Sequence, residues 1–65
     1  MITSNVRQIM ESKKISVRRM MDYTGLANET ILRARGQQIN QCHLRTLEIM
    51  AGYLGCKVKD LFEEN

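Results

Sequence analysis

Residues 16–36 of this 65-residue chain, SVRRMMDYTGLANETILRARG, constrain its fold more than any other stretch. Two short segments with helical spacing of their apolar side chains flank Gly25, and Ser16 precedes the first segment as a predicted N-cap. Gly25 is expected in the left-handed conformation with which helices commonly end. The stretch therefore predicts two short helices, at about 17–23 and 28–35, joined by a tight turn.

The rest of the sequence predicts three further helices around one core. Apolar residues recur at helical spacing over about 4–13, 43–54 and 58–63, whereas residues 36–42 are expected to form a polar loop. The chain contains no proline and shows little strand-like alternation, so we expect an all-α fold. A chain of 65 residues has room for one domain, which is small but able to fold alone. The prediction is a single five-helix domain over residues 1–65.

Positive charge is concentrated in the first two thirds of the chain. Residues 1–45 hold eight Lys or Arg and three Asp or Glu, whereas residues 46–65 hold two and four. A basic face is typical of proteins that bind polyanions, although many small soluble domains are mildly basic. A glycine turn between two short helices is also the signature of a helix-turn-helix, in which one helix can enter the major groove of DNA. Together these features indicate a nucleic-acid partner.

Several short motifs follow one another in a specific order. The chain has Ile15-Ser16 before the first helix of the pair, Met20-Met21 within it, Gly25-Leu26 at the turn, Thr30-Ile31 in the second helix and Gly36 after it. Residues 44–62, LRTLEIMAGYLGCKVKDLF, add a helix ending in Leu-Gly and a short helix ending in Leu-Phe. With these motifs the sequence resembles the lambda-repressor/Cro-like helix-turn-helix family of transcription regulators, from about residue 5 to residue 62.

This resemblance implies a lambda-repressor-like fold and sequence-specific binding of double-stranded DNA by a small phage- or bacterial-type regulator. The helix at about 28–35 would be the recognition helix in the major groove. Three positions depart from the family pattern. Val17 stands where most members have a phosphate-contacting Gln, Ala27 where Ser or Thr often caps the recognition helix, and Met21 where a small residue is usual. These departures affect individual DNA contacts and leave the predicted fold unchanged.

The resemblance also implies which residues contact DNA. Asn28, Glu29, Thr30 and Arg33 are the expected base contacts, because Asn can bond to adenine, Arg to guanine and Glu to cytosine. Glu29 has a second interpretation, in which it only stabilises the positive end of its helix. Phosphate contacts are expected from Ser16, Arg18, Arg35, Gln37, Gln38 and Asn40, with ordinary solvated surface as the alternative for the arginines.

A homodimer on a two-fold operator is expected, because one small domain makes few DNA contacts. With no separate dimerisation domain in the sequence, the interface would lie on one of the last two helices or the tail. Tyr53 and Phe62 are the expected exposed apolar anchors. The competing hypothesis is a protein-interaction module of the same fold, antitoxin-like or adaptor-like, with weak or no DNA binding. The missing Gln at Val17 and the acidic Glu29 favour that alternative.

Other functional classes find little support. The only histidine, His43, has no nucleophile or carboxylate pair spaced around it, so we expect no enzyme activity. Cys42, His43 and Cys56 do not match a structural zinc pattern, and we expect no metal, cofactor or small-molecule ligand. No signal peptide or membrane-spanning segment is recognisable, which predicts a cytoplasmic protein with reduced thiols.

Overall fold

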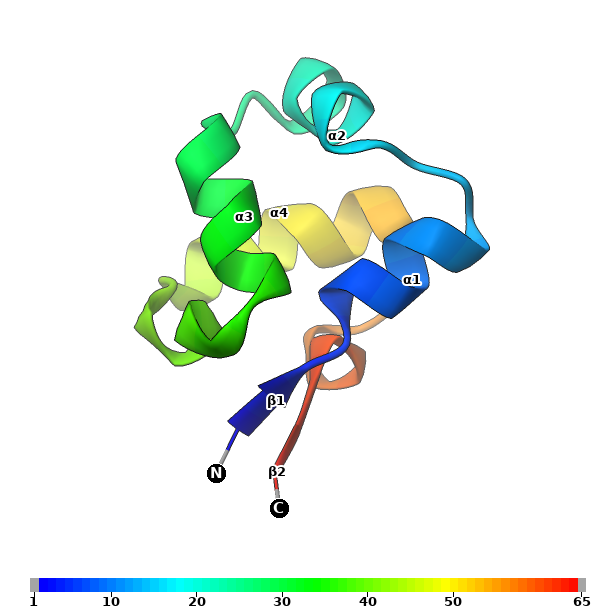
Figure 1. Ribbon diagram of the computed structural model, residues 1–65. Coiled ribbons are helices and arrows are strands. Elements are labelled where there is room, and N and C mark those ends of the chain that lie inside the picture. Colours follow the sequence, from blue (N-terminus) through cyan, green and yellow to red (C-terminus); the bar gives the residue numbers. More distant parts are fainter. Residues whose placement is uncertain (1, 65) are drawn as a thin grey trace.

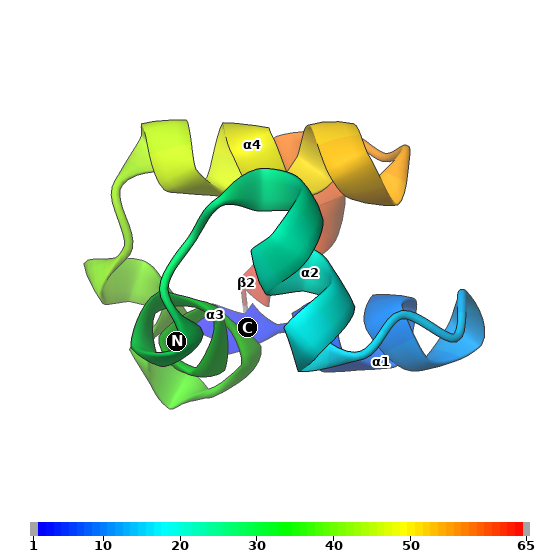
Figure 2. The same cartoon turned by 90° about the horizontal axis from the view of Figure 1, so that it is seen from above.

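The computed structural model describes residues 2–64 and arranges four α-helices in two layers. Helix α4 (Leu44–Leu54) lies along one side of the molecule, and α1 (Val6–Ser12), α2 (Val17–Thr24) and α3 (Asn28–Arg35) lie across the other (Figures 1 and 2). The remaining elements are two 3-10 helices, η1 (Gln37–Gln41) and η2 (Val58–Leu61), and two strands, β1 (Ile2–Ser4) and β2 (Phe62–Glu64).

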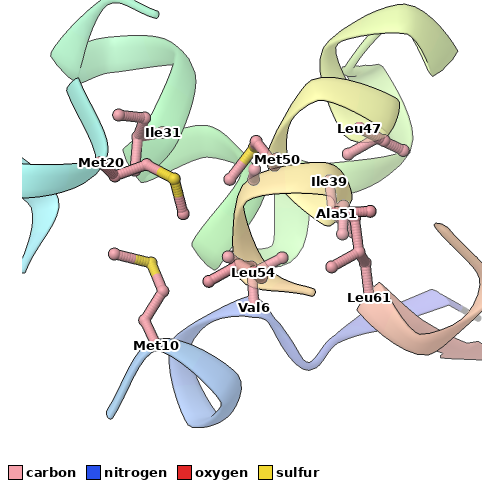
Figure 3. Packing of buried hydrophobic residues seen from close by; sticks show 11 residues of the cluster. Val6, Met10, Met20, Ile31, Ile39, Leu47, Met50, Ala51, Leu54 and Leu61 are labelled. Carbon is pink, nitrogen blue, oxygen red and sulfur yellow. The ribbon is translucent and has the colours of Figure 1, made fainter. Parts of the chain in front are cut away.

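The space between the two layers is filled by apolar side chains from all four α-helices and both 3-10 helices. Met10, Met20 and Met50 enter it from α1, α2 and α4 (Figure 3). Methionine is unbranched and flexible, so it fills irregular gaps in a core with few aromatic rings. The buried apolar residues are Val6, Met10, Met20, Ile31, Ala34, Ile39, Leu47, Met50, Ala51, Leu54 and Leu61.

The turn between α2 and α3 has the predicted geometry. The Ser16 hydroxyl accepts a hydrogen bond from the backbone N–H of Arg19 at 3.1 Å, which confirms Ser16 as the N-cap of α2. Gly25 ends this helix with φ +75°, and its N–H donates to the Met21 carbonyl at 2.9 Å. Helix α3 then spans residues 28–35, the range expected from the sequence.

The prediction of five helices in an all-α fold is wrong in two respects. The expected fifth helix at 58–63 is only the four-residue 3-10 helix η2, after which the chain becomes extended. Helix α1 is also shorter than the expected 4–13, because Ser4 belongs to strand β1. Residues 2–64 thus contain a two-stranded antiparallel sheet, in which Ile2 pairs with Glu64 and Ser4 with Phe62.

Tertiary contacts explain this sheet. The backbone N–H of Asn5 donates to the Leu61 carbonyl at 2.8 Å, which joins the start of α1 to the end of η2. This contact brings residues 2–4 and 62–64 side by side (Figure 1). Each of these segments has only three residues, fewer than one helical turn. Pairing them gives hydrogen-bond partners to their backbone N–H and C=O groups. Ile2 and Phe62 also pack against the core from this sheet.

The expected loop and the expected dimer anchors differ from the prediction as well. Within the polar segment 36–42, residues 37–41 form η1, because the buried Ile39 packs into the core. Tyr53 and Phe62 are half-buried rather than exposed, and the Tyr53 ring is stacked on that of Tyr23. No helix in residues 2–64 has the length and apolar character to cross a membrane.

Candidate nucleic-acid interface

Helix α3 has one buried face and one free face. Ile31 and Ala34 are fully buried, whereas Asn28, Glu29 and Arg33 are exposed. This division follows from the helical repeat of 3.6 residues, which places Glu29 and Arg33 on the same side. Figure 2 shows α3 beside α2 and away from α4. The free face of α3 is therefore a polar surface at the edge of the molecule.

The structure brings three of the predicted DNA-contacting residues together. Glu29 and Arg33 of α3 and Gln38 of η1 line one shallow, open hollow, with Leu32 as its fourth lining residue. Gln38 reaches this position because η1 packs directly against α3. The hollow offers a carboxylate, a guanidinium and an amide within one small area. These groups are suited to the donor and acceptor pattern of base edges.

Other predicted residues lie elsewhere. Thr30 and Arg35 are half-buried. Because Arg35 follows Arg33 by two residues, the side chains of Arg33 and Arg35 leave α3 on different sides. Asn40 lines a separate, largely apolar groove together with Ile2, Ile39, Cys42, Leu44, Leu47 and Phe62. The structure therefore does not bring Asn40 into the hollow with Gln38, although the two residues are close in sequence.

Helix α2 contributes an exposed basic surface next to α3. Arg18 is exposed near its start, whereas Val17 is half-buried and packs against the core. Ser16 uses its hydroxyl oxygen as the helix cap, and its hydroxyl proton remains available as a donor. The predicted residue Gln37 is also exposed, at the start of η1.

Ion pairing distinguishes the arginines of this region from Arg7 on α1. Within residues 2–64, Arg18, Arg33 and Arg35 form no ion pair, whereas Arg7 on α1 pairs with Glu11 at 3.0 Å. Arg33 also acts on a neighbouring thiol. Burial raises the pKa of Cys42, and the nearby Arg33 guanidinium opposes this rise. Unpaired guanidinium groups are the usual ligands of phosphate and of guanine.

Sequence reasoning overlooked Leu32, which lies among the polar residues of the hollow with 49% of its surface exposed. Its position could have been found from helical spacing, because Leu32 is three residues after Glu29 and adjacent to Arg33. The structure also shows that Asn28 is the first residue of α3. Ala27 is the N-cap and makes no side-chain capping bond.

A metal centre finds no support in the described part of the chain. Among residues 2–64, no three His, Cys, Asp or Glu side chains are grouped so that they could hold a metal ion. Cys42 and Cys56 are both free, half-buried thiols.

Comparison with known proteins gives a family for this arrangement. A comparison with curated protein sequences found no match. By contrast, the family profile of the Cro/C1-type HTH DNA-binding domain matches residues 5–65, which include α2, its turn and α3. That match covers nearly the whole chain and agrees with the helix-turn-helix geometry of residues 16–36. The chain therefore belongs to the Cro/C1-type helix-turn-helix DNA-binding domain family.

Proposed function

We propose that this chain is a sequence-specific, double-stranded-DNA-binding transcriptional regulator of phage or bacterial type, with α3 as its recognition helix. The observation that carries the proposal is the free face of α3, where Glu29 and the unpaired Arg33 meet Gln38 in one open hollow. An α-helix fits the major groove, and each base pair shows a distinct donor and acceptor pattern there. A regulator of this kind acts by occupying an operator.

Base recognition and phosphate binding are assigned to different side chains. In this proposal Arg33 bonds to guanine, Asn28 to adenine and Glu29 to cytosine, with Thr30 as a lesser contact. Polar and basic residues on and around α3 hold the sugar–phosphate backbone and so fix the register of the helix. The phosphate contacts are Ser16, Arg18, Arg35, Gln37, Gln38 and Asn40.

Two copies of the chain are expected on each operator. Helix α3 has only eight residues, so one copy reads a few base pairs. A pair of copies related by a two-fold axis doubles the contacts and reads two half-sites about 34 Å apart. The selected DNA site should therefore be palindromic.

Selection of bound duplexes from a random pool, followed by titration over a salt series, tests the proposal. The affinity should fall steeply as salt rises, because phosphate contacts release counterions. Arg33→Ala should cost about 1–3 kcal/mol of binding free energy and relax the preference at one base pair. Arg18→Ala should weaken all sequences alike and reduce the salt slope by about 1. Arg7→Ala is the matched control, because Arg7 lies on α1 and pairs with Glu11.

The competing proposal is a protein-interaction module on the same fold. The apolar, half-buried Val17 at the start of α2 and the exposed carboxylate of Glu29 favour it, because neither attracts phosphate. The same titration separates the two proposals. If no duplex binds even at low salt, the regulator proposal is wrong and a protein partner should be sought.

A further inference from the structure

Leu32 is an apolar side chain on the polar face of α3. It is 49% exposed, whereas its neighbour Ile31 is fully buried in the core. Glu29, Arg33 and Gln38 surround the hollow that Leu32 helps to line. Leu32 is thus not among the buried residues that form the core. The core therefore does not explain a leucine at this position.

Base edges offer one apolar group in the major groove, the C5-methyl group of thymine. If α3 lies in that groove, its free face meets base edges, and Leu32 is the apolar member of the hollow on that face. We propose that Leu32 packs against the C5-methyl group of a thymine and makes this protein select a T·A pair in each half-site. This inference rests on the proposed function and assigns a specificity-determining residue to it.

The neighbours of Leu32 make such a contact selective. Glu29 precedes Leu32 by three residues and Arg33 follows it directly, so polar groups flank the leucine along the helix. Hydrogen bonds from these flanking groups to adjacent bases fix the position of α3 over the thymine. Contact between the methyl group and the leucine then removes apolar surface of both from water, which lowers the free energy of binding.

Replacement of thymine by deoxyuridine removes only this methyl group and keeps the Watson–Crick hydrogen bonds. The experiment takes the duplex selected from the random pool and replaces each thymine in turn with deoxyuridine. Affinities are measured for the wild-type chain, for Leu32→Ala and for Ile49→Ala. Ile49 is the matched control, because it is an exposed aliphatic residue on α4 outside the proposed interface. Circular dichroism verifies that both variants are folded.

At one thymine of each half-site, deoxyuridine should weaken wild-type binding about fourfold, the effect expected for one buried methyl or methylene group. Leu32→Ala should bind the thymine and deoxyuridine duplexes equally, and Ile49→Ala should discriminate as the wild type does. The inference is wrong if every replacement changes wild-type affinity by less than about twofold. It is also wrong if Leu32→Ala keeps the full deoxyuridine penalty, or if the selected half-site contains no thymine.

Failure of the proposed function has a different outcome. In that case the wild-type chain binds no duplex from the pool, and the contact of Leu32 is lost with the function. Sequence-selective binding that is insensitive to deoxyuridine overturns the role of Leu32 alone.

Discussion

The ring of Tyr23 in α2 stacks on the ring of Tyr53 in α4, with centroids 4.9 Å apart and planes inclined by 17°. Tyr23 is 69% exposed, and its ring contacts α4 through this stack. The stack joins the end of α2 to α4. Met20, from the same helix α2, is buried in the core between the two layers. Because α2 carries the turn to α3, the stack helps to hold the helix-turn-helix on α4.

A double-mutant cycle should detect this coupling. Tyr23→Ala and Tyr53→Ala should show a coupling free energy of about 0.5–1.5 kcal/mol, the usual value for a stacked aromatic pair. Urea unfolding of the two single variants and the double variant measures it. The cycle of Tyr23→Ala with Leu44→Ala is the control and should be additive, because Leu44 is exposed at the far end of α4, nine residues before Tyr53. Equal coupling in both cycles contradicts the assigned contact.

Two glycines should respond in opposite directions to alanine. Gly25 has φ +75°, a conformation that costs a residue with a Cβ atom roughly 1–2 kcal/mol, so Gly25→Ala should destabilise the fold by about that amount. Gly52 lies inside α4, and a Cβ atom added there meets nothing within 4 Å. Gly52→Ala should stabilise the fold by about 0.5–1 kcal/mol, because alanine is the better helix former. Thermal unfolding measures the stability of both variants. Changes in Tm of the same sign for the two variants contradict this explanation.

The buried hydroxyl of Ser4 should be important for stability. It donates to the Ala34 carbonyl at 2.5 Å and accepts from the backbone N–H of Val6 at 3.2 Å, so it links β1 to both α3 and α1. Ser4→Ala leaves the Ala34 carbonyl and the Val6 N–H without their hydroxyl partner. It should destabilise the fold by about 1–3 kcal/mol. Ser12→Ala is the control, because Ser12 is exposed, and its effect should stay within about 0.5 kcal/mol. Urea unfolding measures the free energy of unfolding of both variants. Similar losses of stability in the two variants contradict the role of the Ser4 hydroxyl.

The reactivity of Cys42 should depend on Arg33. Burial raises the pKa of the Cys42 thiol and Arg33 opposes the rise, so Arg33→Ala should raise this pKa further. Since the thiolate is the reactive form, alkylation of Cys42 by iodoacetamide at about pH 8 should slow, by up to roughly twofold for a solvent-screened charge. The rate should increase with pH in both proteins.

Cys56 provides an internal control for that measurement. Burial and Asp60 raise its pKa while Lys13 lowers it, and Arg33 takes no part. Mass spectrometry of the two cysteine peptides follows both rates in one sample. The role of Arg33 is contradicted if Cys42 reacts faster in the variant, or if both thiols slow equally.

The helix-turn-helix could be predicted because its signals are local. Ser16 caps the helix that it precedes, and Gly25 adopts the conformation that its missing Cβ atom permits. The free face of α3 was predictable in the same way, since helical spacing separates Ile31 from Glu29 and Arg33.

The features that sequence reasoning missed depend on contacts between distant residues. Nothing near Ser4 indicates that it pairs with Phe62 across the whole length of the chain. Likewise, Gln38 lines the hollow of α3, whereas Asn40 lines a different groove. The two residues separate because η1 turns the chain between Gln38 and Asn40. Their placement required the three-dimensional structure.

The pairing of β1 with β2 also has a consequence during synthesis. Strand β1 leaves the ribosome before the four α-helices, yet its hydrogen-bonding partner consists of residues 62–64. A nascent chain must therefore keep residues 2–4 unpaired while all four α-helices emerge. A premature stop codon before Phe62 removes the partner strand, although it leaves every α-helix encoded.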